Sequence, residues 1–380
     1  MAQIKHIFIL CGEPSGDLLA GGLIREIKRI NPEIKVCGVG GKCLKEAGAE
    51  IICDIKELSV MGLFDVLKKL PRFLSLKKLI IKELNLRKPQ AVIFVDFSGF
   101  NLRLAKAINK RIPTIYYVSP QVWASREKRV NCIRDFISRV IVLFKFEEEF
   151  YRKRAIQAQW VGHPLVSLAA PSMDKQELLR QLKIGPSAKI IALLPGSRKQ
   201  EIKKVLPVML KAARIIGKDI PGSQFIIAKS PNVDMAVYEN ECRRLGIEVR
   251  IIEGKTYDCL NIADACLVCS GTATLETAIM QKPFVIVYKM NLLNYLLYRP
   301  QVKIPYIGIV NIVAGRKIVP EYIQFNARPQ NIACEVLGLM REASRSGQML
   351  KDLSAVKASL GAPGAAERAA RLILDFLKNS

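Results

Sequence analysis

The sequence predicts an α/β protein built from two doubly wound parallel sheets, each covered by helices. Short apolar runs alternate with amphipathic segments, a pattern typical of parallel strands joined by crossover helices. This alternation stops after Pro164, where the chain turns polar, and starts again near Ile190. A length of 380 residues also exceeds what one ordinary hydrophobic core organises. We therefore expect one domain over residues 1–170, completed by a C-terminal helix over 365–380, and a second domain over residues 171–364.

The first half begins with a strand over residues 7–11, a turn over 12–17 and a helix whose leucines and isoleucines recur on one face. Further strands are predicted over residues 35–39, 91–95, 114–118, 140–144 and 159–161.

The second half repeats this pattern. Strands are predicted over residues 190–194, 224–228, 249–252, 265–268 and 284–288, with helices over 202–216, 236–245 and 272–280. The last helix, over residues 365–377, is expected to cross back onto the first domain.

Two turns in the second half carry a pattern that suits a phosphate. Each leaves an apolar strand and enters a helix, so its free N–H groups and the helix dipole favour an anion. The turn residues are Gly196, Ser197 and Arg198 in one turn and Ser270, Gly271 and Thr272 in the other. The Arg198 guanidinium suits the neutralisation of charge on a leaving phosphate oxygen. Glu276 is expected to accept hydrogen bonds from ribose hydroxyls; its alternative is a favourable interaction with the helix dipole.

In the first half, Asp96 comes immediately after the most apolar strand. A carboxylate at that position is partly desolvated, which raises its pKa and suits it to act as a general base. The structural alternative is an Asx turn with Ser98 or Gly99. The other residues expected around this edge are Glu13, Ser15, Gly16, Asp17, Ser119 and His163. Among them Asp17 could instead cap a helix, and a lone histidine is more often structural.

Residues 59–74 interleave apolar with basic side chains, which suits a helix that lies on anionic lipid. The residues assigned to this surface are Met61, Leu63, Phe64, Leu67, Lys68, Lys69 and Arg72. A core helix with a solvated basic face is the alternative. No apolar run approaches the roughly 18 residues that span a bilayer, so we expect a peripheral protein.

Lysine and arginine exceed aspartate and glutamate by 59 − 34 = 25 residues, so polyanions, anionic membranes and phosphorylated ligands are candidate partners. A nucleic-acid-binding protein is disfavoured, because the sharpest basic cluster is paired with aliphatic side chains and not with aromatic ones. The 10 cysteines, with no signal peptide evident before them, indicate free thiols in the cytoplasm. There is no Walker loop, complete G-x-G-x-x-G pattern, paired histidine or D-x-D, so we expect neither cofactor nor metal.

The motifs together closely resemble the lipid-A-disaccharide synthase family of glycosyltransferases. They are GEPSGD at Gly12, SVMGLFDVL at Ser59, FVDFSGFN at Phe94, YYVSPQVWA at Tyr116, VGHP at Val161, LLPGSRKQEI at Leu193, SGTATLE at Ser270 and NIVAGR at Asn311. So many matches in a fixed order over most of the chain make the resemblance specific. Two of the motifs add Glu201 and Asn311 to the expected donor site.

The resemblance implies a GT-B fold, in which two Rossmann-like domains face one another across a cleft that holds the active site. It implies UDP-2,3-diacylglucosamine as donor and 2,3-diacylglucosamine 1-phosphate (lipid X) as acceptor, giving the β-1,6-linked lipid A disaccharide 1-phosphate and UDP without a metal. It also implies a peripheral protein on the cytoplasmic face of the Gram-negative inner membrane, and it leaves a homodimer open. The alternative is another GT-B enzyme that uses UDP-N-acetylglucosamine, such as a cell-wall glycosyltransferase or the 2-epimerase. The apolar surface over residues 61–74 argues against the epimerase.

Overall fold

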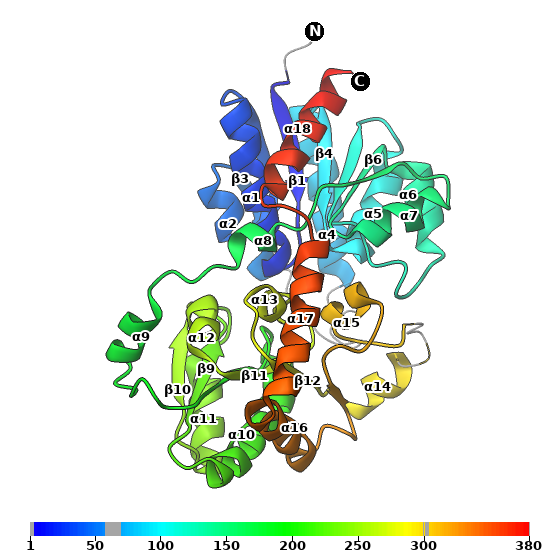
Figure 1. The fold of residues 1–380 in the computed structure, drawn as a ribbon. Helices are drawn as coiled ribbons and strands as arrows, with labels where there is room; N and C mark the ends of the chain where they lie inside the picture. The colour runs from blue at the N-terminus through cyan, green and yellow to red at the C-terminus, as the bar shows by residue number, and fades with distance from the viewer. Residues whose placement is uncertain (1–3, 58–69, 299, 301–303, 380) are drawn as a thin grey trace. The chain divides into compact units, whose positions relative to one another are not determined.

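The computed structural model describes residues 4–57, 70–298, 300 and 304–379 of the chain. Contacts divide them into two compact units, both of which are parallel sheets covered by helices (Figure 1). The first unit runs to Pro164 and also takes the C-terminal segment from Leu360 onward. The second holds Leu165–Pro300 and Ile304–Ser359.

The first unit alternates strands with helices. Its elements are β1 (His6–Leu10), α1 (Pro14–Ile30), β2 (Lys35–Gly40), α2 (Lys42–Glu46), β3 (Glu50–Asp54), a 3₁₀ turn (Ile55–Glu57), α4 (Leu70–Arg87), β4 (Ala91–Val95), α5 (Ser98–Ile108), β5 (Thr114–Tyr117), α6 (Arg129–Phe136), β6 (Arg139–Val142), α7 (Lys145–Arg152), β7 (Ala158–Trp160) and α18 (Ala365–Lys378). The described strands pair in the order β3-β2-β1-β4-β5-β6-β7, all parallel. The order therefore changes direction between β1 and β4.

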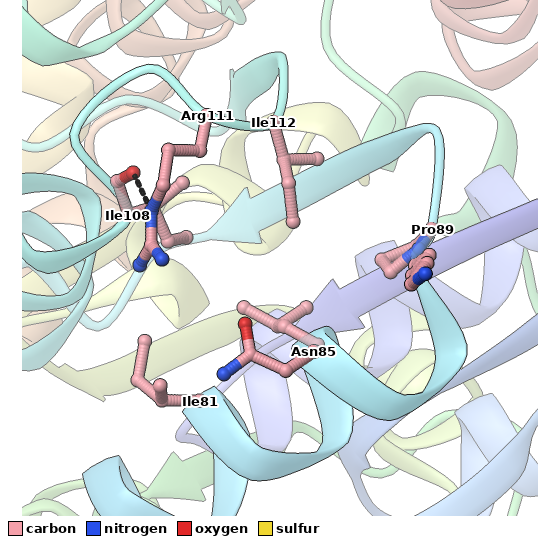
Figure 2. Close-up of a pocket in the computed structure, with 8 residues that line it drawn as sticks. Ile81, Asn85, Pro89, Ile108, Arg111 and Ile112 are labelled. Carbon is pink, nitrogen blue, oxygen red and sulfur yellow. Dashed lines mark hydrogen bonds between the residues drawn. The ribbon is translucent and has the colours of Figure 1, made fainter.

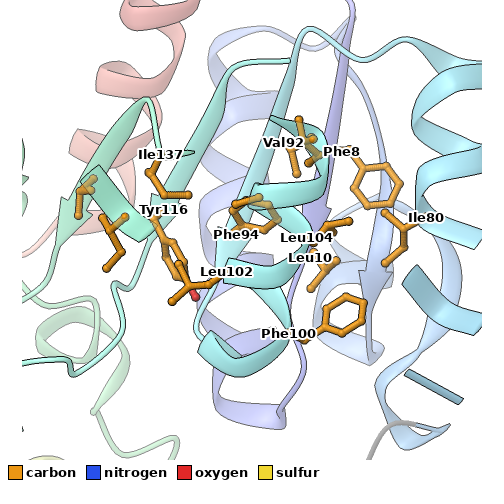
Figure 3. Packing of buried hydrophobic residues seen from close by; sticks show 14 of the residues in the cluster. Phe8, Leu10, Ile80, Val92, Phe94, Phe100, Leu102, Leu104, Tyr116 and Ile137 are labelled. Carbon is orange, nitrogen blue, oxygen red and sulfur yellow. The ribbon is translucent and has the colours of Figure 1, made fainter. Parts of the chain in front are cut away.

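Helices α4 and α5 cover one face of this sheet (Figure 3). Ile80 of α4 and Phe100 and Leu104 of α5 pack against the strand residues Phe8 and Phe94. All five side chains are buried, and burial of one such side chain contributes about 1.5–3 kcal/mol. Because β1 and β4 are covered on both faces, they read as continuous apolar runs, which is why the sequence located them readily.

The C-terminal segment is fastened to the first unit. Helix α18 lies against α1, and Arg29 pairs with Glu367 at 2.9 Å. Arg368 donates hydrogen bonds to the main-chain oxygens of Val161, Ala362 and Pro363 at 2.8, 2.7 and 2.7 Å. These bonds fix the path of the chain into α18.

The second unit has the same alternation. Its elements are α8 (Leu165–Leu168), α9 (Lys175–Gln181), β8 (Ile190–Leu194), α10 (Lys199–Asp219), β9 (Gln224–Lys229), α11 (Met235–Leu245), β10 (Arg250–Glu253), α12 (Thr256–Ile262), β11 (Ala265–Cys269), α13 (Thr272–Ile279), β12 (Phe284–Tyr288), α14 (Leu292–Tyr298), α15 (Ile309–Ala314), β13 (Glu321–Ile323), α16 (Pro329–Arg341) and α17 (Ala343–Ser359). Its described strands pair in parallel in the order β10-β9-β8-β11-β12-β13. Here the order changes direction between β8 and β11.

The prediction of two doubly wound α/β sheets is confirmed, and its errors lie at the edges. The sequence did not reveal β3 or β13, which are outer strands without fully buried residues and so lack a strong apolar run. Helix α10 extends beyond the predicted 202–216 at both ends, because its terminal turns are polar and fall outside the apolar periodicity.

Candidate functional site

The turn after β4 has an uncommon backbone. Asp96 and Phe97 have φ angles of 49° and 47°, in the left-handed region that residues other than glycine rarely adopt. The neighbouring strand β5 ends in the same way, at Val118 with φ 60°. The Asp96 N–H donates to the Val118 oxygen at 3.3 Å, so the two turns are joined. Each such residue costs on the order of 1–3 kcal/mol, and strain of this kind gathers at functional sites.

Two buried side chains hold the Asp96 main chain in this conformation. The Tyr116 hydroxyl donates to the Asp96 oxygen at 2.6 Å, and Asn101 Nδ2 donates to the same oxygen at 2.8 Å. Both residues are fully buried, whereas Asp96 is half-buried at the end of its strand. Asp96 is therefore held on a fixed backbone at the carboxyl edge of the sheet.

The turn after β1 lies against the Asp96 turn. A Cβ at Gly12 would lie 2.2 Å from Cγ of Phe97, so only glycine fits under that ring. A Cβ at Gly16 would lie 3.8 Å from Cβ of Asp96 and 3.4 Å from Cβ of Cys11. Helix α1 begins here, with Pro14 in its first turn. The structure thus brings residues 12–17 next to Asp96, as adjacent parallel strands require. The predicted turn over 12–17 is too long, because α1 already begins at Pro14, which suits the first turn of a helix.

The polar residues of the first turn point in different directions. Glu13 is half-buried at the N-cap of α1, and Ser15 is exposed. Asp17 is 4% exposed and turns inward. Its carboxylate accepts hydrogen bonds from the N–H groups of Gly41, Cys43 and Leu44 at 2.7, 2.9 and 3.2 Å. Asp17 therefore holds the start of α2, and it does not cap its own helix.

Ser119 and His163 are both buried, with exposures of 6% and 5%. The His163 ring lies 5.2 Å from the ring of Phe144, and burial lowers the pKa of His163 to about 3. The imidazole is thus neutral near pH 7 and is almost entirely shielded from solvent.

Glu147 is a buried carboxylate that the sequence analysis missed. Its Oε1 accepts from Nε1 of Trp123 at 3.0 Å, and its Oε2 accepts from the N–H of Phe144 at 3.2 Å. Burial raises the pKa of Glu147 to about 7. The side chain ties the segment that follows β5 to the start of α7. Glu147 is the third residue of a helix that follows an apolar strand. That position is typical of a glutamate that caps a helix, and this pattern could have revealed it in the sequence.

In the second unit the two glycine turns lie side by side, because β8 and β11 are paired with Leu194 opposite Val268. Gly196 has φ +112°, and a Cβ there would lie 3.0 Å from Oε2 of Glu201. Gly271 has φ +150°. Both positions thus favour glycine.

Arg198 and Glu201 form an ion pair at the start of α10, with Nη1 3.3 Å from Oε1. Arg198 is exposed, whereas Glu201 is mostly buried. Tyr288 is the last residue of β12. Its pKa is raised to about 12, mainly by burial and also by the nearby charge of Glu201. Tyr288 is thus a neutral hydroxyl beside the ion pair, and the sequence analysis did not single it out.

The β11 turn is tied to a segment later in the chain. Ser270 Oγ donates to the Ile307 oxygen at 2.9 Å, while Thr272 is exposed at the first position of α13. Glu276, one turn further along, accepts a hydrogen bond from the Tyr257 hydroxyl at 2.8 Å. Burial raises the pKa of Glu276.

Asn311 is fully buried and uses all of its hydrogen-bonding capacity within the protein. Its Nδ2 donates to the Val319 oxygen at 2.8 Å and to Oε1 of Glu321 at 2.9 Å. Its Oδ1 accepts from the N–H groups of Ile318 and Val319, both at 2.9 Å. No donor or acceptor of the Asn311 side chain is left for a ligand. We therefore give it a positioning role in place of the predicted direct contact.

Both groups of predicted residues lie at the carboxyl ends of strands where the strand order changes direction. One group follows β1 and β4, and the other follows β8 and β11. Open α/β sheets bind ligands at such points, because the connections diverge there and leave a crevice.

A separate hollow of about 300 Å³ lies at the opposite edge of the first sheet (Figure 2). Pro89 and Ile112 in its lining precede β4 and β5, so it opens at the amino ends of these strands. Arg111, also in the lining, donates to the Ile108 oxygen at 3.1 Å. This hollow includes none of the predicted site residues.

Most of the predicted membrane surface lies outside the described residues, namely Met61, Leu63, Phe64, Leu67, Lys68 and Lys69. Arg72 is described: it lies on α4 and pairs with Glu57 at 2.9 Å. No helix within the described ranges has the length and hydrophobicity needed to span a bilayer.

Comparison with known proteins gives consistent matches. The family model described as lipid-A-disaccharide synthetase matches residues 7–373. Lipid-A-disaccharide synthase of Syntrophus aciditrophicus (strain SB) is 40% identical over 378 residues, which are 99% of each chain. The protein of that name from Coxiella burnetii (strain CbuG_Q212) is 36% identical over 375 residues, 98% of this chain and 99% of its own.

Solved structures with little sequence identity share the fold. UDP-GlcNAc 2-epimerase from Neisseria meningitidis, bound to UDP-GlcNAc, has a TM-score of 0.62 at 13% identity and covers 99% of this chain and 100% of its own. The calicheamicin glycosyltransferase CalG4 has a TM-score of 0.60 at 15% identity and covers 100% of this chain and 99% of its own. These likenesses confirm the expected GT-B class with two Rossmann-like domains.

Proposed function

This chain belongs to the lipid-A-disaccharide synthase family of hexosyltransferases, and we propose that it transfers 2,3-diacylglucosamine from its UDP donor to lipid X. The products are lipid A disaccharide 1-phosphate and UDP. The observation that carries the proposal is the position of two chemically different groups at the two switch points. A carboxylate follows β4, and a guanidinium beside two glycine turns follows β8.

Asp96 is proposed as the general base. Its carboxylate takes the proton of the acceptor's 6-hydroxyl while the oxygen attacks the anomeric carbon of the donor. The new bond joins O6 to C1, and the bond between C1 and the phosphate oxygen breaks, so its electron pair leaves with UDP. Direct attack inverts the anomeric centre and gives the β linkage. The left-handed backbone of Asp96 and the two hydrogen bonds to its main-chain oxygen support this role. They fix the position of the base before the substrate binds.

Arg198 is proposed to stabilise the leaving UDP. Its exposed guanidinium stands at the N-terminus of α10, where positive charge of the helix dipole adds to its own. Glu201 restrains the guanidinium by the ion pair. In this role Arg198 supplies the charge neutralisation for which other glycosyltransferases use a divalent cation.

The remaining donor residues are proposed to hold the nucleotide. The N–H groups and hydroxyls around Gly196, Ser197, Ser270, Gly271 and Thr272 suit a diphosphate. Glu276 suits the ribose hydroxyls, and its bond from Tyr257 keeps the carboxylate in place. Asn311 acts indirectly, since Glu321, which it binds, also accepts from the N–H groups of Ile307 and Gly308 at 3.0 and 2.9 Å.

Both proposed substrates carry acyl chains, which reside in a membrane, so the enzyme must contact the membrane surface to reach them. We propose that residues 59–74 form this contact on the cytoplasmic face of the inner membrane, with apolar side chains at the headgroup boundary and basic ones against anionic lipid. Their sequence pattern supports the proposal.

The direct test is incubation of the purified protein with UDP-2,3-diacylglucosamine and lipid X in detergent micelles, followed by mass spectrometry of the lipid. We expect the disaccharide 1-phosphate, in equal yield with and without EDTA. UDP-N-acetylglucosamine serves as a control donor. Consumption of that donor without any product from the acylated donor would contradict the proposal.

A further inference from the structure

Arg129 lies beside the Asp96 turn. It is the first residue of α6, and its Nη1 donates to Oγ of Ser98 at 2.9 Å. Ser98 begins α5, two residues after Asp96. The bond to Ser98 gives this guanidinium a neutral partner and not a counter-charge.

Two further positive charges act on this guanidinium. Burial lowers the pKa of Arg129, and the neighbouring charges of Arg126 and Arg103 add to the effect. The adjacent Glu127 pairs with Arg154 at 2.5 Å, and so its charge is engaged by another cation. A half-buried guanidinium among like charges is costly without a counter-ion, so this cluster favours a bound anion.

We propose that Arg129, assisted by Arg126 and Arg103, binds the phosphate monoester of the acceptor. The inference rests on the proposed function and extends it to acceptor recognition. A guanidinium matches a phosphate with two parallel N–H···O bonds, and Ser98 Oγ holds one edge of the group in place.

The position of the cluster fits the chemistry of the acceptor. In a hexosamine 1-phosphate, C1 and C5 flank the ring oxygen, so the phosphate on C1 and the 6-hydroxyl on C6 are a short distance apart. A phosphate at Arg129 thus suits a 6-hydroxyl near Asp96, because Asp96 lies two residues before the serine that binds Arg129. The same chemistry is offered by an anionic lipid headgroup, so the experiment must separate these two sources.

The test compares Arg129→Gln and Arg129→Lys with wild type, using lipid X and its dephosphorylated form, 2,3-diacylglucosamine, as acceptors at saturating donor. We expect Arg129→Gln to raise KM for lipid X about tenfold to a hundredfold, because a charge-assisted pair is lost. KM for the dephosphorylated acceptor should change less than about twofold, since that acceptor has no phosphate to lose. Arg129→Lys should show an intermediate KM, since it keeps the charge and loses the fork.

Arg134→Gln is the matched control, because it removes one exposed positive charge from the same helix. Its KM values should equal those of wild type. Arg126→Gln removes an exposed charge without a buried contact, so it tests the cluster even if Arg129→Gln does not fold, and it should raise KM for lipid X severalfold.

An equal rise in KM for both acceptors in Arg129→Gln would overturn the inference, since Arg129 would then act only through the Asp96 turn. Weaker binding of Arg129→Gln to phosphatidylglycerol vesicles, with KM for lipid X unchanged, would assign the cluster to a headgroup and would also overturn it. Calorimetry of lipid X in micelles, with wild type and with Arg129→Gln, measures binding of the acceptor without any turnover. Binding that depends on Arg129 without any transfer would refute the proposed function alone, and transfer without such dependence would refute the phosphate site alone.

Discussion

Replacement of Asn311 by alanine tests whether this residue positions the donor site or contacts the nucleotide. The substitution leaves three main-chain groups, at Ile318 and Val319, without their buried partner, whereas the Glu321 oxygen keeps its bond from the N–H of Gly308. Each such group costs about 1–3 kcal/mol when unsatisfied, and water that enters the vacated space recovers part of this. We expect the free energy of unfolding of the second unit to fall by about 3–5 kcal/mol.

The assay is urea unfolding of wild type, Asn311→Ala and the exposed control Asn232→Ala, with UDP binding measured on the folded fraction. The control should keep the wild-type midpoint, because its side chain is exposed. UDP affinity of Asn311→Ala should weaken only severalfold, through loss of order in the segment that Glu321 holds. A loss of stability below about 1 kcal/mol, combined with a hundredfold weaker UDP affinity, would refute the positioning role, since one neutral hydrogen bond contributes about that much.

Arg198→Ala should lower kcat by about 10²–10³, by analogy with the loss of one donor that stabilises developing negative charge. Arg198→Lys should recover part of the rate, because the charge remains and the planar fork is lost; a fully active Arg198→Ala would exclude the role. Glu147→Gln should change the pH dependence of stability. The pKa of Glu147 is raised from 4.5 to about 7 by burial, so its stabilising protonation is complete below pH 4.5 and is lost as pH rises through 7. His163 acts in the opposite sense, since its pKa is lowered from 6.5 to about 3 and stability is lost as pH falls below 6.5. The melting temperature of Glu147→Gln relative to wild type should therefore rise between pH 5 and pH 8, and a constant difference would contradict the buried, protonatable carboxylate.

The strands and turns that carry the site were predictable from the sequence, because a parallel strand covered on both faces reads as an apolar run. The residues after such a run must lie at the carboxyl edge. This is why Asp96, Gly16 and the two glycine turns of the second unit were located without knowledge of the pairing.

The direction in which each polar side chain points was not predictable, because it depends on partners distant in sequence. Asp17 binds N–H groups more than twenty residues away, at the start of α2. Asn311 reaches the strand β13 and the residues before it. Arg129 is one of many basic residues in the chain, and what distinguishes it is its bond to Ser98 and its partial burial.

Asp96→Asn tests the central claim most directly. Asparagine tolerates the left-handed conformation of this turn, so the substitution removes basicity and keeps the backbone. Single-turnover transfer from UDP-2,3-diacylglucosamine to lipid X should slow by about 10²–10⁴, while UDP binds with wild-type affinity. Wild-type turnover by Asp96→Asn would show that another group accepts the proton, and it would contradict the account.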